Sequence, residues 1–369
     1  MESCDVLIVG GGPAGSSLAW KLRGSGLDVL IMDKSDFPRD KVCAGWVTPQ
    51  VFKALQIDPD EYSKKRILQH ITGFLTGMMG GTGILNEYGK TVSYGIRRSE
   101  LDHYLLHRSG SRLQLGEALK TINRHDNHWI LNDCIKTPLI IGAGGHFCPV
   151  SRLINSAKGK NGAVIVAKEI EFEMDYRQEK ECGIRPDIPE LYFCDDLKGY
   201  GWCFRKGRYL NIGLGREDKG GISNHLESFS RLLIKQGKVS HIPPNFKGHA
   251  YMLYPPTSRN LVDDGVMLIG DAAGLAHPKS GEGIRPAIES GLIAANVIIA
   301  AAGNYKKERL QLYPELLEKR LGRFNTGNPF ILIPEALKKT VSHRLMATKW
   351  FSRHIVLDRW FLNSNQGPL

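Results

Sequence analysis

Short apolar runs separated by glycine-rich turns mark the first part of the chain. Residues 5–9 (DVLIV) are almost entirely apolar, and GGGPAG followed by SSLAWKLRGSG comes directly after them. The run predicts a buried strand, the glycines a tight turn and the following stretch a helix. A second apolar run, DVLIMDK at 28–34, predicts the next strand. Strands that alternate with a helix in this way are typical of a doubly wound α/β domain.

Other parts of the chain show different patterns. Tyr200, Trp202 and Phe204 occupy every second position, so a strand would place all three aromatic rings on one face. The apolar stretch LIAANVIIAAA at 292–302 predicts a buried helix. Nowhere does the sequence hold about 18 consecutive apolar residues, so we expect no transmembrane helix.

The first glycine-rich turn has the spacing of a dinucleotide-binding loop. Gly10, Gly12 and Gly15 form G-x-G-x-x-G, in which the first glycine permits the turn and the second lets a pyrophosphate approach the backbone. The third glycine allows the helix to pack closely on the strand. Asp33 ends the second predicted strand, where an acidic residue binds the ribose hydroxyls. The motif is weak alone, but the strand, the helix and the acidic residue around it predict dinucleotide binding.

A second turn of this kind occurs far along the chain, in the stretch VMLIGDAAGLAHPKSGEGI at 266–284. An apolar strand ends at Gly270-Asp271, and a helix is expected to begin near Ile284 after the doubled glycines Gly281 and Gly283. A strand-end carboxylate accepts hydrogen bonds from ribitol or ribose hydroxyls. Glycines at a helix N-terminus aim N–H groups at the anionic edge of a reduced isoalloxazine. An ordinary strand–helix turn would explain Gly270 alone.

Composition and charge narrow the function classes. The chain has 369 residues, 42% of them hydrophobic, which is enough for two domains. Its seven cysteines are scattered without a C-x-x-C pair, so we expect neither a metal site nor a disulfide framework, and a cytoplasmic location. The net charge is +11, and twelve Lys/Arg against five Asp/Glu lie in residues 305–369. No zinc-finger or RNP pattern accompanies these cations, so we expect no nucleic-acid partner.

The basic C-terminal region also has helical periodicity. Leu337, Val341 and Leu345 recur at four-residue spacing, and lysines and arginines are interleaved with them. Such an amphipathic segment either lies on an anionic membrane leaflet or packs on the cofactor-binding domain with its charges in water. Both interpretations stay open, and the first predicts peripheral membrane association.

Three motifs together resemble the FAD-dependent group that includes p-hydroxybenzoate hydroxylase, flavin-dependent halogenases and geranylgeranyl reductases. They are GGGPAG…MDK at 10–34, RRSELDHYLL at 97–106 and GDAAGLAHPKSGEGI at 270–284, in the order of the group. The resemblance implies an α/β fold with a doubly wound, Rossmann-like FAD-binding domain, a mostly antiparallel substrate-covering sheet and a helical C-terminal region. The expected segments are 1–75, 96–164 and 256–304 for the FAD-binding domain, 76–95 and 165–255 for the substrate-covering domain, and 305–369 for the C-terminal region.

The same resemblance implies which residues contact FAD. In such proteins the arginine of an R-x-x-[FL]-D stretch, here Arg98, reaches the cofactor, and a backbone group at Leu119 would meet the adenine. The expected cofactor-binding residues are Gly10, Gly12, Pro13, Ala14, Gly15, Asp33, Lys34, Lys41, Ala44, Arg98, Leu119, Gly270, Asp271, Gly281, Gly283 and Ile284.

One departure from the group concerns the electron supply. Hydroxylases of the group usually carry GADG at the end of a mid-chain strand, whereas this chain has GAGG, with Gly144 in place of the aspartate. The missing carboxylate disfavours a hydroxylase. The candidate electron donors are NAD(P)H and a ferredoxin or another carrier.

Two stretches are similar to geranylgeranyl reductases in particular: KVCAGW to their K-x-C-G-G pattern, and GYGWCFRK to their Y-x-W-x-F-P pattern. The matching residues are Lys41, Cys43 and Gly45 in the first and Tyr200, Trp202 and Phe204 in the second. A thiol beside cations has a lowered pKa and could donate a proton or position substrate, although Cys43 could equally be an inert buried group. The aromatic face lines a lipid cavity or belongs to the core of the sheet.

The resemblance therefore predicts an FAD-dependent oxidoreductase that reduces C=C bonds of an isoprenoid or other hydrophobic substrate by hydride transfer from reduced flavin. Its expected catalytic-site residues are Cys43, Tyr200, Trp202 and Phe204. One alternative is an FAD-dependent monooxygenase or halogenase that acts through a flavin C4a-peroxide. The other is a non-catalytic or electron-transfer flavoprotein.

Overall fold

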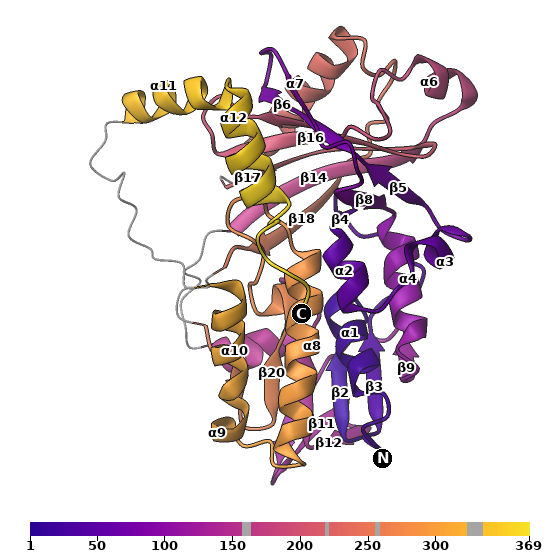
Figure 1. Cartoon of the computed structure of the whole chain (residues 1–369). Coiled ribbons are helices and arrows are strands. Elements are labelled where there is room, and N and C mark those ends of the chain that lie inside the picture. Colours follow the sequence, from indigo (N-terminus) through magenta and orange to yellow (C-terminus); the bar gives the residue numbers. More distant parts are fainter. Residues whose placement is uncertain (157–163, 218–220, 255–258, 323–334) are drawn as a thin grey trace. The chain divides into compact units, whose positions relative to one another are not determined.

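The chain divides into two compact units in the computed structural model, which describes residues 1–156, 164–217, 221–254, 259–322 and 335–369, with the backbone alone for 335–340. The first unit comprises Met1–Asp40, Ser99–Ala163 and Tyr251–Phe324, and the second comprises Lys41–Arg98, Val164–Ala250 and Asn325–Leu369. Figure 1 shows both units as layers of sheet and helix. The division differs from the expected one, because residues 41–75 belong to the second unit and the C-terminal region is shared between the two.

A six-stranded sheet forms the centre of the first unit, in the order β19-β20-β13-β2-β3-β9. Its strands are β2 (Val6–Val9), β3 (Val29–Asp33), β9 (Arg112–Leu115), β13 (Leu139–Gly142), β19 (Val262–Asp263) and β20 (Val266–Leu268). All neighbouring pairs are parallel except β19 with β20. The two early apolar runs, β2 and β3, are therefore adjacent strands, and the later run β20 joins the same sheet on the other side of β13, as in a doubly wound sheet.

Helices and a smaller sheet complete the first unit. The sheet has the order β1-β12-β11-β10. Its strands are β1 (Glu2–Ser3), β10 (Ile122–His125), β11 (His128–Leu131) and β12 (Ile135–Thr137). The helices are α1 (Pro13–Leu22), α4 (Arg98–Arg108), α5 (Pro149–Asn155), η1 (Gly270–Ala272), α8 (Ile284–Ala301), α9 (Lys307–Leu310) and α10 (Leu312–Leu321).

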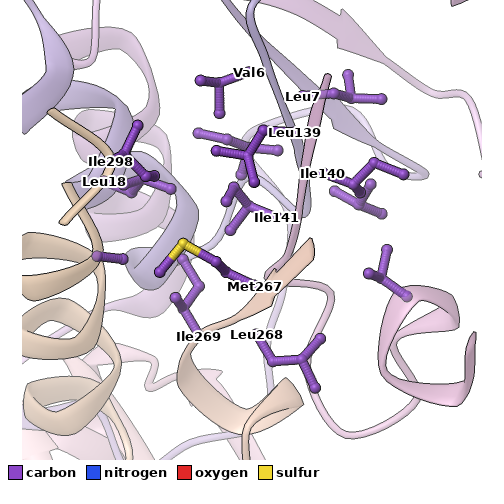
Figure 2. Packing of buried hydrophobic residues seen from close by; sticks show 14 of the residues in the cluster. Val6, Leu7, Leu18, Leu139, Ile140, Ile141, Met267, Leu268, Ile269 and Ile298 are labelled. Atoms are coloured by element: carbon purple, nitrogen blue, oxygen red, sulfur yellow. The ribbon is translucent and has the colours of Figure 1, made fainter. Parts of the chain in front are cut away.

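The core of the first unit lies between the large sheet and its helices. Every residue of β2 and β3 is buried, and Figure 2 shows side chains of β2, β13 and β20 packed with Leu18 of α1 and Ile298 of α8. Small residues bring the two helices together, because a Cβ added to Gly291 would lie 2.5 Å from the carbonyl oxygen of Ala14. Burial of these continuous apolar strands on both faces is the main stabilising contribution.

Helix α8 also contains the apolar stretch that predicted a buried helix. Within the described part of the chain, it is the one helix long and apolar enough, by length and composition, to cross a membrane. In the structure 83% of the segment Ile284–Ala301 is buried inside the protein, which is typical of a core helix.

The second unit is built on a seven-stranded sheet in the order β18-β14-β17-β16-β15-β6-β7. It also contains a three-stranded sheet in the order β4-β8-β5. Its elements up to the C-terminal helices are β4 (Trp46–Val47), α2 (Pro49–Ala54), α3 (Pro59–Ser63), β5 (Leu68–Ile71), β6 (Gly73–Met78), β7 (Ile84–Glu87), β8 (Ser93–Ile96), β14 (Val164–Glu173), α6 (Tyr176–Glu181), β15 (Glu190–Phe193), β16 (Gly199–Lys206), β17 (Tyr209–Arg216), α7 (Ile222–Lys235) and β18 (Lys247–Met252). Strands β14, β17, β16 and β15 pair in antiparallel fashion, and β15 pairs with β6 in parallel. The predicted fold class is confirmed.

Three helical segments at the C-terminus belong to the second unit: α11 (Glu335–Met346), α12 (Lys349–Phe351) and the π-helix η2 (Ser352–Phe361). The hydroxyl of Ser352 accepts a hydrogen bond from Asn86 at 2.8 Å, and Tyr88 donates one to Asp358 at 2.6 Å. The contacts named here bond η2 within the second unit, and of the two interpretations of the amphipathic tail the membrane contact stays a prediction.

Candidate cofactor and substrate sites

The glycines of the β2–α1 turn have distinct structural roles. Gly10 has a φ of +120°, and a Cβ on it would lie 2.4 Å from the carbonyl oxygen of Ala143. A Cβ on Gly15 would lie 2.0 Å from the carbonyl oxygen of Gly10. Gly12 differs, because its φ of −72° suits any residue and the nearest atom to an added Cβ is Arg39 Nη2 at 3.5 Å. The first and third glycines thus serve packing, while the second leaves a cradle open beside the backbone.

The start of α1 provides hydrogen-bond donors next to this cradle. Gly12 is the N-cap residue, Pro13 occupies the first turn, and no side chain of the described residues caps the helix. Asp33 shapes the turn, since its carboxylate accepts hydrogen bonds from the N–H groups of Gly11 at 2.8 Å and Ser35 at 3.0 Å. Each carboxylate oxygen keeps further acceptor capacity for a ribose hydroxyl. The residues present therefore fit a dinucleotide.

The second glycine-rich turn, at 270–284, lies against the start of α1 within the same unit. A Cβ on Gly270 would lie 2.9 Å from the Cβ of Ala14, and the N–H of Gly270 donates to Ser290 Oγ at 3.0 Å. A Cβ on Gly283, the N-cap of α8, would lie 3.3 Å from Asp271 Oδ1. The strand-end carboxylate and the N-terminus of α8 at Ile284 are thus neighbours, as the sequence pattern predicts.

Gly281 is required by its own conformation and surroundings. Its φ is +69°, and an added Cβ would lie 2.3 Å from the hydroxyl of Tyr251. Of the remaining expected residues in the first unit, Lys34 is exposed, and Leu119 packs partly against the core. The segment that holds Leu119 is tied to the site through Glu117, whose N–H donates to the carbonyl oxygen of Asp33 at 3.1 Å.

Three expected cofactor-binding residues lie in the second unit: Lys41, Ala44 and Arg98. Arg98 is buried at the start of α4, and Lys41 Nζ lies 2.9 Å from His249 Nε2. Gly144, which replaces the aspartate of hydroxylases, lies in the first unit beside Cys148, whose Sγ would be 3.3 Å from an added Cβ.

Burial changes the ionisation of two groups just before α8 that the sequence patterns did not single out. Burial, together with the nearby cations Lys279 and Arg285, lowers the pKa of His277 to about 4. Burial raises the pKa of Glu282 to about 7, and the charge of Arg285 opposes this rise. The N–H of His277 donates to the carbonyl oxygen of Glu282 at 2.8 Å. At neutral pH this loop therefore carries a neutral imidazole and a carboxyl near its titration midpoint.

The aromatic positions of β16 lie on one face, as predicted. Register places Trp202 opposite Gly213 and Phe204 opposite Asn211 on β17, and β14 adds Glu169 and Glu171 to the same two rows. The glycine makes room for the indole, because a Cβ on Gly213 would lie 2.3 Å from Trp202 Cζ2. The face therefore carries carboxylates as well as aromatic rings.

The three aromatic residues differ in burial. Phe204 is 1% exposed and contacts Trp46, with ring centroids 5.9 Å apart, so it belongs to the core of the sheet. Trp202 is 6% exposed, and Tyr200 is half-buried at 6.0 Å from the Trp202 ring. Of the two interpretations of this face, the core interpretation fits Phe204, and the lining interpretation stays a prediction for Tyr200 and Trp202.

Cys43 is half-buried, and its backbone is bonded to the sheet that carries these rings. Its N–H donates to Glu169 Oε1 at 2.6 Å, and its carbonyl oxygen accepts a hydrogen bond from Asn211 Nδ2 at 3.2 Å. The N–H of Gly45, which has a φ of +67°, approaches Cys43 Sγ at 3.4 Å. The contact with Glu169 adds a carboxylate to the cations expected around this thiol.

Glu169 and Asn211 were missed by the sequence analysis. Burial raises the pKa of Glu169 to about 7, although the Cys43 N–H, Lys206 and Asn211 each lower it. A signal was present, since Glu169, Glu171 and Glu173 alternate with apolar residues in a strand-like run. Carboxylates at every second position of a strand share one face, and here that is the aromatic face.

Comparison with known proteins agrees with this description. A family model described as an NAD(P)-binding Rossmann-like domain matches residues 8–41. A digeranylgeranylglycerophospholipid reductase of Methanococcus vannielii is 27% identical over 327 residues, which are 85% of this chain and 81% of that protein. A menaquinone reductase of Mycobacterium tuberculosis is 28% identical over 344 residues, 87% of this chain and 81% of that protein.

Solved structures share the fold. A geranylgeranyl bacteriochlorophyll reductase-like protein from Thermoplasma acidophilum is 23% identical with a TM-score of 0.73, covering 94% of this chain and 88% of that chain. A flavin-dependent brominase is 18% identical with a TM-score of 0.67, covering 86% of this chain and 84% of that chain. The predicted resemblance to the group of geranylgeranyl reductases and halogenases is confirmed at the level of relatives and fold.

Proposed function

We propose that this chain is an FAD-dependent oxidoreductase that reduces C=C bonds of an isoprenoid lipid or a similar hydrophobic substrate. Two relatives named as reductases, one of a digeranylgeranyl phospholipid and one of menaquinone, support this over most of their length. The structural observation that carries the proposal is a chain of hydrogen bonds: Trp202 Nε1 donates to Asn211 Oδ1, and Asn211 Nδ2 donates to the carbonyl oxygen of Cys43. The thiol segment is thereby attached to the aromatic face.

The first unit would hold FAD. Gly12 and the uncapped N-terminus of α1 would accept the diphosphate, and Asp33 would bind the adenosine ribose. Asp271 would accept from ribitol hydroxyls, and the N–H groups at the start of α8 would face the anionic edge of the flavin ring. When bound and reduced, FAD supplies the hydride for one carbon of the double bond.

The second unit would provide the substrate surface and the proton. Tyr200 and Trp202 would line the path of the hydrophobic chain, and Phe204 would support them from the core. Addition of a hydride to one carbon leaves the other in need of a proton, which the Cys43 thiol or a water molecule would deliver. The thiolate so formed regains its proton from solvent, since Cys43 is half-buried.

NAD(P)H and a reduced ferredoxin are the candidate electron donors. The presence of Gly144 favours ferredoxin as the donor, because hydroxylases carry at this position an aspartate that helps organise nicotinamide entry. Reduction of the flavin by each donor, followed under anaerobic conditions by the loss of flavin absorbance, separates the two.

Peripheral contact with the cytoplasmic leaflet is part of the proposal, because a polyprenyl lipid resides in the bilayer. Val341, Leu345 and Trp350 are 47%, 41% and 65% exposed, whereas Met346 is buried. Arg344 and Lys349 are exposed among them. Exposed apolar side chains beside cations are suited to an anionic membrane surface.

The test is single-turnover reduction without oxygen. Dithionite-reduced protein is mixed with an unsaturated digeranylgeranyl lipid or with menaquinone, and the return of flavin absorbance is followed. Mass spectrometry of the extracted lipid should show the mass of one H2 gained per reduced bond. Flavin reoxidation only after air is admitted, with an oxygenated or halogenated product, would instead establish the oxygen-using alternative.

A further inference from the structure

Both polar groups of the Cys43 peptide are bound by buried side chains of the second unit. The N–H of Cys43 donates to Glu169 Oε1 at 2.6 Å, and the carbonyl oxygen of Cys43 accepts from Asn211 Nδ2 at 3.2 Å. The same amide nitrogen of Asn211 lies 3.2 Å from Glu169 Oε2, which links the two side chains. Glu169 and Asn211 are 6% and 1% exposed. Together they form a two-point clamp on a loop residue.

The orientation of the Asn211 amide is itself fixed. Trp202 Nε1 donates to Asn211 Oδ1 at 2.7 Å, so the amide must present its nitrogen to Cys43 and Glu169. Glu171, two residues along β14, lies 3.4 Å from the same nitrogen, and it accepts from Lys206 Nζ and Arg97 Nε. The clamp is therefore continuous with the residue that we place on the substrate surface, and its polar groups are saturated by named partners.

Chain topology gives the clamp rigid supports. Glu169 projects from β14 and Asn211 from β17, which pair from Val166 to Glu173 of β14, whereas Cys43 lies in the loop before β4. A half-buried thiol in a loop keeps a defined position only where its backbone is tied to such elements. These contacts do not involve the sulfur atom, so they would act on the thiol through its position.

We propose that Glu169 and Asn211 are positioning residues that hold the Cys43 thiol for proton delivery. Through its hydrogen bond with Asn211, Trp202 on the substrate surface is part of the same network. The inference rests on the proposed function for the use of the thiol, but the clamp itself is a property of the protein that is measurable without turnover. Glu169 and Asn211 touch neither substrate nor cofactor in this scheme.

The first experiment measures alkylation of Cys43 by iodoacetamide in the FAD-containing protein, with peptide mapping to separate it from the other cysteines. Glu169→Gln keeps the size of the side chain, but its NH2 group must face either the Cys43 N–H or the Asn211 amide nitrogen, both of which are donors. Asn211→Leu removes the hydrogen bond to the Cys43 carbonyl oxygen. Each should raise the alkylation rate at least about tenfold by opening the loop. Glu190→Gln is the matched control, since Glu190 is a buried carboxylate that binds Lys238 and Tyr192 instead. It should change the rate by less than about twofold. Equal rates in wild type and both clamp variants would overturn the proposal.

The second experiment tests coupling to chemistry. In single-turnover reduction, Glu169→Gln should slow lipid reduction about tenfold in the wild-type background and less than about twofold in the Cys43→Ser background, while the lipid concentration that gives the half-maximal rate stays unchanged. Equal slowing in both backgrounds would mean that Glu169 does not act through the thiol, and would overturn the positioning role. If no variant, including wild type, reduces lipid, the proposed function fails, and the alkylation result still decides whether the clamp exists.

Discussion

Phe361 stacks on Trp46, with ring centroids 5.4 Å apart and ring planes 12° apart, so the C-terminal helical segment η2 packs on β4 within the second unit. Phe361 is 2% exposed, and it also contacts Tyr200 at 5.3 Å between centroids. The C-terminal segment is thus a structural part of the aromatic cluster.

Truncation of Phe361 should therefore destabilise the protein. We expect Phe361→Ala to lower the free energy of unfolding by about 3–5 kcal/mol, because it leaves a cavity among aromatic rings. Trp350→Ala, at a position 65% exposed, should change it by only about 0.5 kcal/mol. Urea unfolding followed by circular dichroism measures both. Equal effects of the two substitutions would contradict the packing of η2 in the core.

Substitutions at two glycines of the β2–α1 turn should have different effects, one on FAD binding and the other on folding. Gly12→Val should yield folded protein that retains little FAD, because Gly12 has an ordinary φ and its added side chain would enter the cradle, not the protein. Gly15→Val should reduce the folded yield, since even a Cβ would overlap the carbonyl oxygen of Gly10. The measurements are flavin content per folded protein and melting temperature. Full FAD content in folded Gly12→Val would place the diphosphate elsewhere.

These glycines show why so much of the cofactor site could be predicted from sequence. The spacing of Gly10, Gly12 and Gly15 reflects local backbone geometry, and residues close in the chain must satisfy it whatever the rest of the fold. The alternation of Tyr200 and Trp202 is local in the same way, so their common face was predictable.

Contacts between distant segments could not be predicted in this manner. The N–H of Cys43 meets Glu169 across 126 residues, and Asn211 of β17, which contacts Glu169 of the paired strand β14, bonds the carbonyl oxygen of the same loop residue. The packing of η2 similarly depends on Ser352 meeting Thr76 and Asn86, and neither pattern nor composition encodes that partnership. Helical periodicity correctly indicated helices near the C-terminus, but it could not tell which unit they join.

The raised pKa of Glu169 should appear in the pH dependence of stability. Because burial raises this pKa from 4.5 to about 7, folding favours the protonated carboxyl, and this contribution is complete below pH 4.5 and lost as pH rises through about 7. Wild type should therefore lose roughly 3 kcal/mol of unfolding free energy relative to Glu169→Gln between these limits, since glutamine does not titrate. Urea unfolding at a series of pH values measures the difference. Parallel stability curves for the two proteins would show that Glu169 ionises normally.

Membrane contact predicts binding that depends on charge and on one exposed face. The full-length protein should cosediment with anionic vesicles at low salt, detach as salt is raised, and ignore neutral vesicles, because each cation near the surface contributes about 1 kcal/mol that ions screen. Deleting the whole C-terminal region is a poor test, since Ser352 and Phe361 are buried in the second unit. Point substitutions on the exposed face keep that packing intact.

The informative comparison is between two adjacent pairs of exposed residues, each with one apolar and one cationic side chain. Lys349→Glu with Trp350→Ala should weaken binding to anionic vesicles at least about tenfold, since it reverses a cation and removes an apolar anchor. Ile234→Ala with Lys235→Glu, on α7, changes the net charge equally and should weaken binding about twofold at most. If both pairs weaken binding equally, attraction is a matter of net charge and no defined face is used. If wild type ignores anionic vesicles at low salt, the enzyme must receive its substrate from solution or from a carrier, and a less lipophilic substrate becomes the better hypothesis.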